Sequence, residues 1–124
     1  MYTSINDLEQ VGRAVSACVE CSLSETRNRA VPGEGPTNAQ ILFVGEAPGY
    51  NEDIQGKPFV GRAGMFLDEL LKSVQLERGE VFITNIVKCR PPNNRDPEAT
   101  EIAACKKYLD KQIELLEPKI IVTL

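Results

Sequence analysis

Four cysteines and no histidine are the residues of this chain best suited to chemistry. Cys18 and Cys21 form a C-x-x-C pair, Cys89 opens a proline-rich loop, and Cys105 follows on a predicted helix. Four thiolates complete a four-coordinate site for zinc or for an iron–sulfur cluster, and the C-x-x-C spacing lets two sulfurs reach one metal centre. The pattern therefore favours a metal site formed by all four cysteines.

The alternatives to a metal site are disulfide bonds and four separate small buried side chains. Residues 1–10 include Asp7 and Glu9 and no apolar run, so they do not form a signal peptide. We therefore expect a cytoplasmic protein. Because thiols stay reduced in that compartment, a metal is favoured over disulfides.

The bulk composition predicts one globular domain of 124 residues without a membrane-crossing stretch, so we expect no membrane association. A net charge of −4 argues against a protein that coats DNA by bulk attraction, but affinity for nucleic acid follows local clusters of charge. Such a cluster lies in or beside two loops rich in glycine and proline. Its members are Lys57, Arg62, Lys88, Arg90 and Arg95. These cations could contact DNA, although an ordinary solvated loop accounts for them equally well.

Apolar runs separated by helical patterns predict the order of secondary structure. The predicted strands are 41–44, 81–87 and 120–122. The predicted helices cover 5–17, a segment around 66–74 that ends at Gly79, and a segment from 97 to Pro118. Strand–helix–strand alternation predicts a three-layer α/β/α sandwich with a central parallel sheet. We expect one domain over 1–124, in which 1–40 contribute the first helix and the first cysteine pair and 41–124 form the α/β core.

Local signals predict where these elements begin and which faces they bury. Ser4 followed by Asp7 resembles a capping signal for the first helix, and Asp96 followed by Pro97 is typical of a helix start. The glycine-rich segment 45–64 is expected to be a loop. Two helix faces are expected to be buried, formed by Phe66, Leu67, Leu70, Leu71 and Val74 and by Ile102, Cys105, Leu109, Ile113 and Leu116.

A ligand should bind at the carboxyl ends of the strands, because open parallel sheets form their crevice there. Glu46 follows the first strand and supplies a carboxylate at its tip. Phe59 lies between basic residues and could stack on a base, although plain core packing is the simpler interpretation. Asn85 ends the second strand and could read a base edge through its amide, although asparagine is also common in turns.

Three motifs in this order resemble the iron–sulfur uracil-DNA glycosylases, known as family four. They are G-E-A-P-G at 45–49, G-K-P-F-V-G-R-A-G at 56–64 and T-N-I-V-K-C-R-P-P-N-N-R-D-P at 84–97. The cysteine positions and the segment V-P-G-E-G-P at 31–36 agree with the same family. The glutamate of the first motif distinguishes this family from a sister family that lacks it. The resemblance implies the uracil-DNA glycosylase fold and activity, with uracil-containing DNA as the partner and a role in base excision repair.

The resemblance also implies roles for individual residues. Glu46 matches the group that orients or activates the attacking water, Phe59 the aromatic that stacks on the extruded uracil, and Asn85 the amide that reads the uracil edge. Backbone amides from Ala47 to Gly49 are expected to face the base. Cys18, Cys21, Cys89 and Cys105 match the ligands of a [4Fe–4S] cluster that fixes their loops.

The sequence departs from the family in one respect. The family's active site also uses a histidine in a later H-P-S-like motif, whereas this sequence has no histidine. We therefore expect the chain to be truncated at its C-terminus, with the third strand left as an exposed edge. Excision by this chain alone should be strongly reduced. Two alternatives stay open: a non-catalytic iron–sulfur module that binds nucleic acid, and a zinc-stabilised nucleotide-binding domain. In the first alternative Glu46→Ala changes nothing measurable, and metal content identifies the second.

Overall fold

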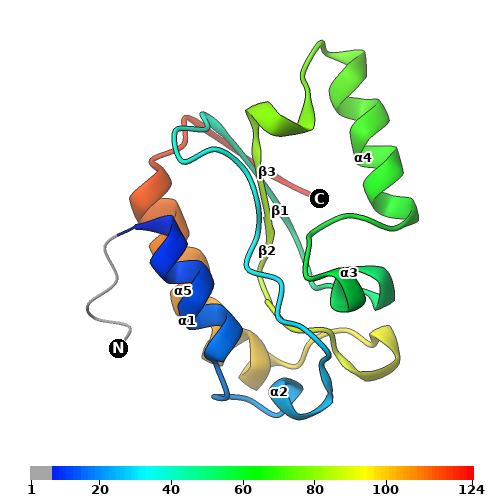
Figure 1. The fold of residues 1–124 in the computed structure, drawn as a ribbon, viewed down its shortest axis with the longest axis vertical. Coiled ribbons are helices and arrows are strands. Elements are labelled where there is room, and N and C mark those ends of the chain that lie inside the picture. Colours follow the sequence, from blue (N-terminus) through cyan, green and yellow to red (C-terminus); the bar gives the residue numbers. More distant parts are fainter. Residues whose placement is uncertain (1–6) are drawn as a thin grey trace.

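Three parallel strands form the centre of the molecule in a computed structural model that describes residues 7–124. They are β1 (Ile41–Gly45), β2 (Phe82–Asn85) and β3 (Ile120–Thr123), and their order in the sheet is β2-β1-β3. Both neighbours of β1 run parallel to it (Figure 1). The chain therefore has the parallel sheet that its sequence predicts.

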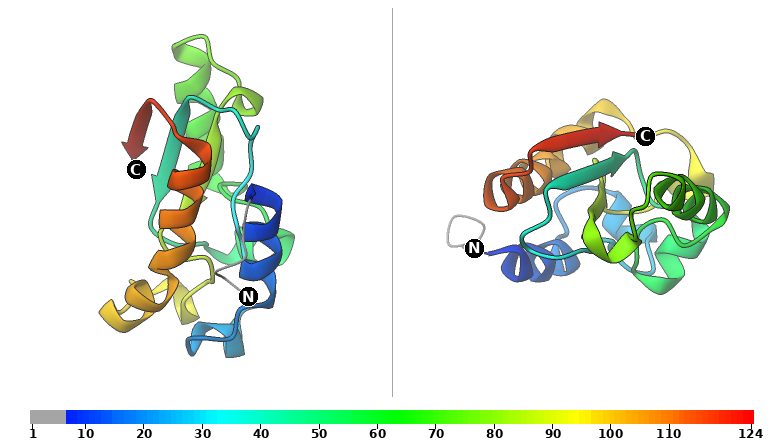
Figure 2. Two further views of the ribbon diagram at one scale, coloured as in Figure 1. Left: turned by 90° about the vertical axis from the view of Figure 1, so that its left-hand side faces the viewer. Right: turned by 90° about the horizontal axis from the view of Figure 1, so that it is seen from above.

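Helices cover both faces of this sheet. Helix α1 (Leu8–Ala17) packs beside α5 (Ala99–Leu116) on one face, and α4 (Arg62–Ser73) covers the other, as the views in Figures 1 and 2 show. Successive side chains of β1 point to opposite faces of the sheet. Leu42 packs in the hydrophobic cluster that includes Leu116 of α5, and Phe43 packs against α4. The prediction of an α/β/α sandwich is confirmed.

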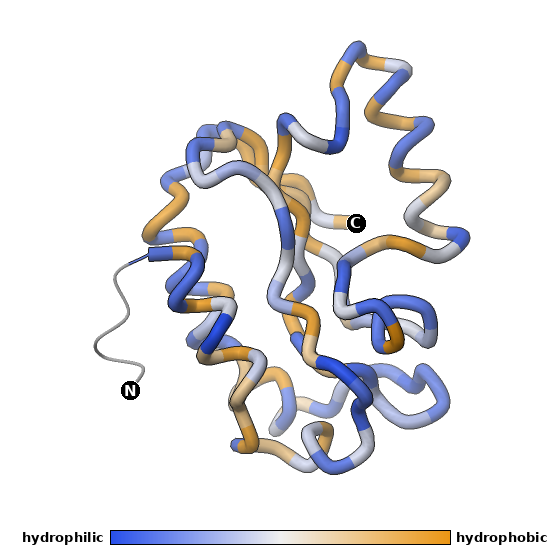
Figure 3. The backbone as a smooth tube through the Cα atoms, viewed as in Figure 1, coloured by the Kyte–Doolittle hydropathy of each residue, from blue (hydrophilic) through white to orange (hydrophobic). Residues whose placement is uncertain are grey.

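The remaining elements are short and lie in the connections. They are α2 (Leu23–Thr26), α3 (Tyr50–Gln55) and the 3-10 turns η2 (Arg78–Glu80) and η3 (Pro92–Asn94). The segment between β2 and α5 (yellow in Figure 1) is mostly hydrophilic in Figure 3. No helix within residues 7–124 is long and apolar enough to cross a membrane.

The carboxyl ends of β1 and β2 meet at one point of the sheet. Gly45 is the register partner of Asn85, and the pairing continues as Ile86 N donates to Gly45 O at 2.9 Å and Val87 N to Glu46 O at 3.0 Å. The two loops that carry the predicted site therefore leave the sheet side by side.

Several element boundaries differ from the sequence-based expectations. The predicted 45–64 loop contains α3 and the first turn of α4. Within the described residues the first helix begins at Leu8, because the Asp7 side chain accepts a hydrogen bond from Gln10 N and acts as its N-cap. Residues 5 and 6 of the predicted helix lie outside the described residues. The expected role of Ser4 lies outside the described residues. Asp96 is not the N-cap of α5, which is Glu98.

The predicted buried face of α4 is only partly correct. Leu67 and Leu71 are buried against the sheet, whereas Phe66, Leu70 and Val74 are 62%, 44% and 64% exposed. The reason is geometric: α4 contacts the sheet along a narrow i, i+4 stripe, and no described element packs on its outer side. The helix also ends at Ser73, before Gly79.

The third strand lies at an edge of the sheet, as expected. In the described part of the chain β3 pairs only with β1, and Ile120 and Ile121 are about half exposed, at 53% and 47%. On α5, Cys105 and Leu116 are buried as predicted, while Ile102, Leu109 and Ile113 pack against the core from its border.

Candidate active site and metal centre

A cavity of about 260 Å³ lies where β1 and β2 end. Its lining residues are Glu46, Ala47, Pro48, Gly49, Glu52, Phe59, Ala63, Asn85, Pro91, Asn94 and Arg95. A larger hollow of about 760 Å³ lies between α1 and the 32–37 segment, away from these residues. We assign the candidate site to the smaller cavity because it collects convergent polar groups and an aromatic ring, as small-molecule sites do.

Glu46 presents a free carboxylate to this cavity. The residue is exposed, and its side chain makes no hydrogen bond or ion pair within residues 7–124. The cavity's other carboxylate, that of Glu52, is occupied by backbone amides. Glu46 is therefore the lining carboxylate that is available to a ligand or to water.

Phe59 and Asn85 both lie against Gly45, the last residue of β1. A Cβ atom on Gly45 would stand 2.5 Å from Asn85 Oδ1 and 2.6 Å from Phe59 Cζ, closer than real Cβ contacts allow. The missing side chain of Gly45 thus leaves the space in which the carboxamide and the ring approach each other.

The backbone at Phe59 is unusual. Its φ of 52° lies in the left-handed region, which a bulky residue rarely adopts. The next helix closes on it, since a Cβ on Gly64 would stand 1.8 Å from Phe59 O. The surrounding chain therefore holds this aromatic residue in one conformation.

The Asn85 side chain is open to the cavity although the residue is only 2% exposed. Its side chain makes no hydrogen bond within the described residues. Every fully buried side-chain nitrogen or oxygen atom there has a hydrogen-bond partner, so the Asn85 amide is not among the fully buried groups. The amide of Asn85 must therefore reach the cavity surface, where it can pair with a ligand.

The backbone amides of the first motif differ from the expectation at one position. Gly49 N donates to Glu52 Oε1 at 2.9 Å, so the prediction that this amide faces a base is wrong, although Gly49 lines the cavity. Pro48 has no amide hydrogen. Ala47 N makes no hydrogen bond within the described chain, and its residue also lines the cavity.

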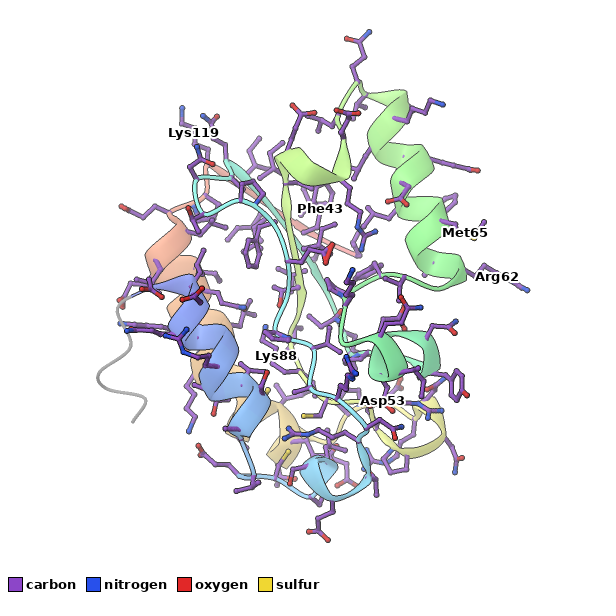
Figure 4. All side chains as sticks on the ribbon, viewed as in Figure 1. Phe43, Asp53, Arg62, Met65, Lys88 and Lys119 are labelled. Atoms are coloured by element: carbon purple, nitrogen blue, oxygen red, sulfur yellow. The ribbon has the colours of Figure 1, made fainter. Side chains whose placement is uncertain are left out.

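Two of the five predicted DNA-contacting cations lie near the cavity. Arg95 lines it, and the Arg90 guanidinium stacks 5.4 Å from the centre of the exposed Tyr50 ring while its Nε donates to Asn94 Oδ1 at 2.7 Å. Lys57 and Arg62 are exposed on the segment that leads into α4 but do not line the cavity, and Arg62 points away from the rest of the molecule in Figure 4.

Arg95 is tied to the start of α5. Its Nη1 and Nη2 donate to the two oxygens of Glu101 at 2.9 and 2.8 Å, and Glu98 N donates to Glu101 Oε1 at 2.9 Å. These hydrogen bonds, that of Arg95 first, lower the pKa of the Glu101 carboxyl to about 2. The pair fixes one side of the cavity.

Lys88 is the clear exception among the predicted DNA contacts. Its side chain is 1% exposed and lies inside the molecule (Figure 4). The ammonium donates to Thr84 Oγ1 at 2.6 Å, Asn85 O at 2.6 Å and Gln112 Oε1 at 2.7 Å. Burial lowers its pKa to about 7, opposed by Cys105. The prediction that Lys88 contacts DNA is wrong, because this side chain braces β2 against α5.

The four cysteines line one hollow below the ends of α1 and α5. It is bordered by Cys18, Glu20, Cys21, Ser24, Arg27, Val87, Cys89, Ala104 and Cys105. Cys18 is the C-cap of α1, and all four thiols are free of disulfides. Residues far apart in the sequence thus present four sulfur atoms to one place.

Two of these sulfurs accept hydrogen bonds. Arg27 Nη1 donates to Cys89 Sγ at 3.0 Å, and Lys88 N donates to Cys105 Sγ at 3.3 Å. Burial raises the pKa of both thiols, to about 11 for Cys105, and these donors oppose the shift. Donors of this kind stabilise thiolates, which are the form that binds metal.

The four cysteines border the same hollow. Within residues 7–124 no three His, Cys, Asp or Glu side chains are arranged to hold a single metal ion. A [4Fe–4S] cluster attaches each cysteine to a different iron, so its ligands stand farther apart than those of one zinc ion. Four thiols around one hollow, with N–H donors to two of them, fit such a cluster.

Sequence reasoning missed several residues that shape these sites. Glu52, Asn94 and Tyr50 contribute to the cavity or its rim, and Arg27 borders the cysteines. Asn94 could have been found, since it belongs to the asparagine pair of the third motif. Glu52 could not, because α3 itself was not predicted.

Comparison with known proteins finds that this chain is similar to uracil-DNA glycosylases. The family model described as the Uracil DNA glycosylase superfamily matches residues 32–124. The type-4 uracil-DNA glycosylase of Sulfurisphaera tokodaii is 58% identical over 121 residues, which are 97% of this chain and 55% of that protein. That of Thermotoga maritima is 50% identical over 124 residues, which are 100% of this chain and 65% of the relative.

A more distant relative is the type-5 uracil-DNA glycosylase of Thermus thermophilus, 36% identical over 111 residues. The match covers 77% of this chain and 50% of that protein. The chain thus spans between about half and two thirds of the length of these relatives. The resemblance stated from the three motifs is confirmed: the chain belongs to the uracil DNA glycosylase superfamily.

Proposed function

We propose that this protein is a type-4 uracil-DNA glycosylase, which extrudes uracil from DNA and hydrolyses its N-glycosidic bond. One observation carries the proposal: a single cavity brings together the free carboxylate of Glu46, the ring of Phe59 and the unpaired amide of Asn85. The type-4 name of the more similar relatives supports it.

In this proposal the cavity selects uracil by stacking and by hydrogen bonds. The base stacks on Phe59, and the Asn85 amide donates to uracil O4 and accepts from N3–H. Cytosine has an amino group in place of O4 and no hydrogen on N3, so both contacts are lost. The free N–H of Ala47 is a further donor toward the base.

Hydrolysis breaks the bond between uracil N1 and sugar C1′. The electron pair of this bond leaves with the uracil anion, and C1′ acquires oxocarbenium character. The Glu46 carboxylate stabilises that positive charge and orients the water whose oxygen bonds to C1′. The water gives up one proton, which ends on uracil, so that the products are free uracil and an abasic sugar.

The exposed cations supply the contacts to DNA in this proposal. Arg90 and Arg95 lie at the cavity, and Lys57 and Arg62 lie on the neighbouring segment. They are suited to phosphates flanking the extruded nucleotide, and such contacts make binding dependent on salt. The acidic remainder of the chain limits binding elsewhere.

We further propose that Cys18, Cys21, Cys89 and Cys105 hold a [4Fe–4S] cluster. When bound, the cluster supplies a structural cross-link among the cysteine-bearing segments. Four cysteines border one hollow, and four thiolates are the ligand set of a [4Fe–4S] cluster, so the zinc alternative is decided by metal content. Reduced thiols require a reducing compartment, so we propose a cytoplasmic protein.

Uracil excision from a single-stranded oligonucleotide by anaerobically purified protein tests the enzyme proposal. Because the sequence lacks histidine, we expect slow excision, and Glu46→Ala should reduce it about 100-fold further. Glu69→Ala, which removes an exposed carboxylate on α4, is the matched control. An equal rate for the Glu46 variant and wild type would refute the role of Glu46.

The non-catalytic alternative makes a different prediction. It expects no excision by any variant, together with uracil-independent binding of nucleic acid. Analysis of iron, sulfide and zinc in the purified protein tests the cluster separately. Iron and sulfide in equal amounts support it, whereas one zinc per chain refutes it.

A further inference from the structure

Glu52 of α3 joins two segments that shape the base cavity. Its Oε1 accepts from Gly49 N at 2.9 Å, and its Oε2 accepts from Val60 N at 3.0 Å and from Gly61 N at 2.9 Å. The first amide belongs to the glycine-rich turn after β1, and the other two directly follow Phe59. One carboxylate therefore links the turn to the aromatic segment.

The segment around Phe59 has few other anchors. Phe59 has left-handed φ, and the residues beside it belong to neither a helix nor a strand. On its N-terminal side, Arg78 Nη2 donates to Pro58 O. On its C-terminal side, the Glu52 carboxylate holds the amide of Val60. The backbone on both sides of Phe59 is thus held by side chains of other segments, Arg78 and Glu52.

A carboxylate suits this position better than a neutral side chain. Gly61 is the N-cap of the 12-residue helix α4, whose first amides lack partners within the helix and whose dipole favours negative charge. The three N–H donors are shared between two acceptor atoms of the side chain. A carboxylate has two acceptor oxygens, whereas a carboxamide has one oxygen and one NH₂ group that can only donate.

From this geometry we propose that Glu52 is a positioning residue that sets the Phe59 ring over the uracil cavity. The inference rests on the proposed function, because it assumes that Phe59 stacks on the base. Glu52 is not itself a base, since the three amides occupy its oxygens. The free carboxylate of Glu46 and the bound carboxylate of Glu52 thus have separate tasks in one cavity.

The test uses Glu52→Gln, with Glu69→Gln as the same change on an exposed site. Amide hydrogen exchange at Val60 and Gly61 reports the anchor directly and needs no activity. We expect exchange there to be about tenfold faster in the Glu52 variant, because hydrogen bonds to a charged acceptor are lost. Unchanged exchange at both amides would overturn the inference.

A binding measurement separates positioning from a general loss of structure. The probes are single-stranded oligonucleotides with one 2′-fluoro-deoxyuridine or one 2′-fluoro-thymidine, since the 2′-fluorine slows bond cleavage. We expect Glu52→Gln to lose about tenfold in affinity for the uracil probe and little for the thymine probe. An equal loss for both probes would also overturn the inference.

The two proposals fail in different ways. If wild type does not prefer the uracil probe, the proposed function fails, and the exchange rates alone decide whether Glu52 anchors the segment. If Glu52→Gln loses the slow exchange of β1 and β2, it is unfolded. Glu52→Asp then replaces it, since it keeps both oxygens but is one methylene shorter, and the same two results support or overturn the inference.

Discussion

The substitution Gly45→Ala should disturb the cavity, because it places a methyl group against both the Asn85 amide and the Phe59 ring. The new Cβ would stand 2.5 Å from Asn85 Oδ1 and 2.6 Å from Phe59 Cζ, so one or both side chains must move by roughly 1 Å to reach ordinary contact. Gly45 has an ordinary φ, so the effect comes from contact and not from backbone strain.

Overpacking of this kind costs about 1–3 kcal/mol of unfolding free energy. For a domain of this size that corresponds to a fall in Tm of about 4–12 °C. Function should suffer more than stability, because displacing groups that hold the reacting base by about 1 Å can cost about 100-fold in rate.

Thermal unfolding and binding of the uracil probe, followed by excision where it is measurable, check this prediction. Gly79→Ala is the matched control, since a Cβ there meets nothing within 4 Å. We expect the control to change stability by less than about 0.5 kcal/mol. If Gly45→Ala melts and binds like Gly79→Ala, the described packing of Asn85 and Phe59 against Gly45 is incorrect.

Three further predictions concern the neighbouring contacts. The pKa of Glu101 in the folded protein is about 2, below its value in the unfolded chain. The contribution of Glu101 to stability is therefore present above about pH 4.5 and is lost as pH falls toward 2. Glu101→Gln should flatten that part of a plot of unfolding free energy against pH. Arg27→Gln removes the guanidinium donor to Cys89, so the proposed cluster should have a lower reduction potential and bleach faster in air than in the Arg13→Gln control. Equal potentials would argue against this contact. Asn85→Ala should reduce the preference for uracil over cytosine about tenfold or more in competition binding, and an unchanged preference would assign recognition to other groups.

The structure also explains which features were accessible from local sequence. Apolar runs locate the three strands to within two residues. For β1, burial on both faces requires the uninterrupted apolar side chains that form this signal. Cap positions were less accessible. Asp96 resembles an N-cap, but Glu98 holds that position because Glu101 on the first turn accepts from its amide.

By itself the sequence determined the parallel α/β class and the family, and it supplied most of the candidate site residues. The order of the motifs and the spacing of Cys18 and Cys21 are properties of the chain alone. What those side chains contact was decided by tertiary structure. Lys88 resembles a DNA contact in sequence, yet α5 supplies Gln112 as its partner and buries it. Glu52 resembles a surface residue, yet it accepts three amides from two loops. Burial and hydrogen bonding depend on how separate segments of the chain pack together, and a local pattern does not encode which of them will meet.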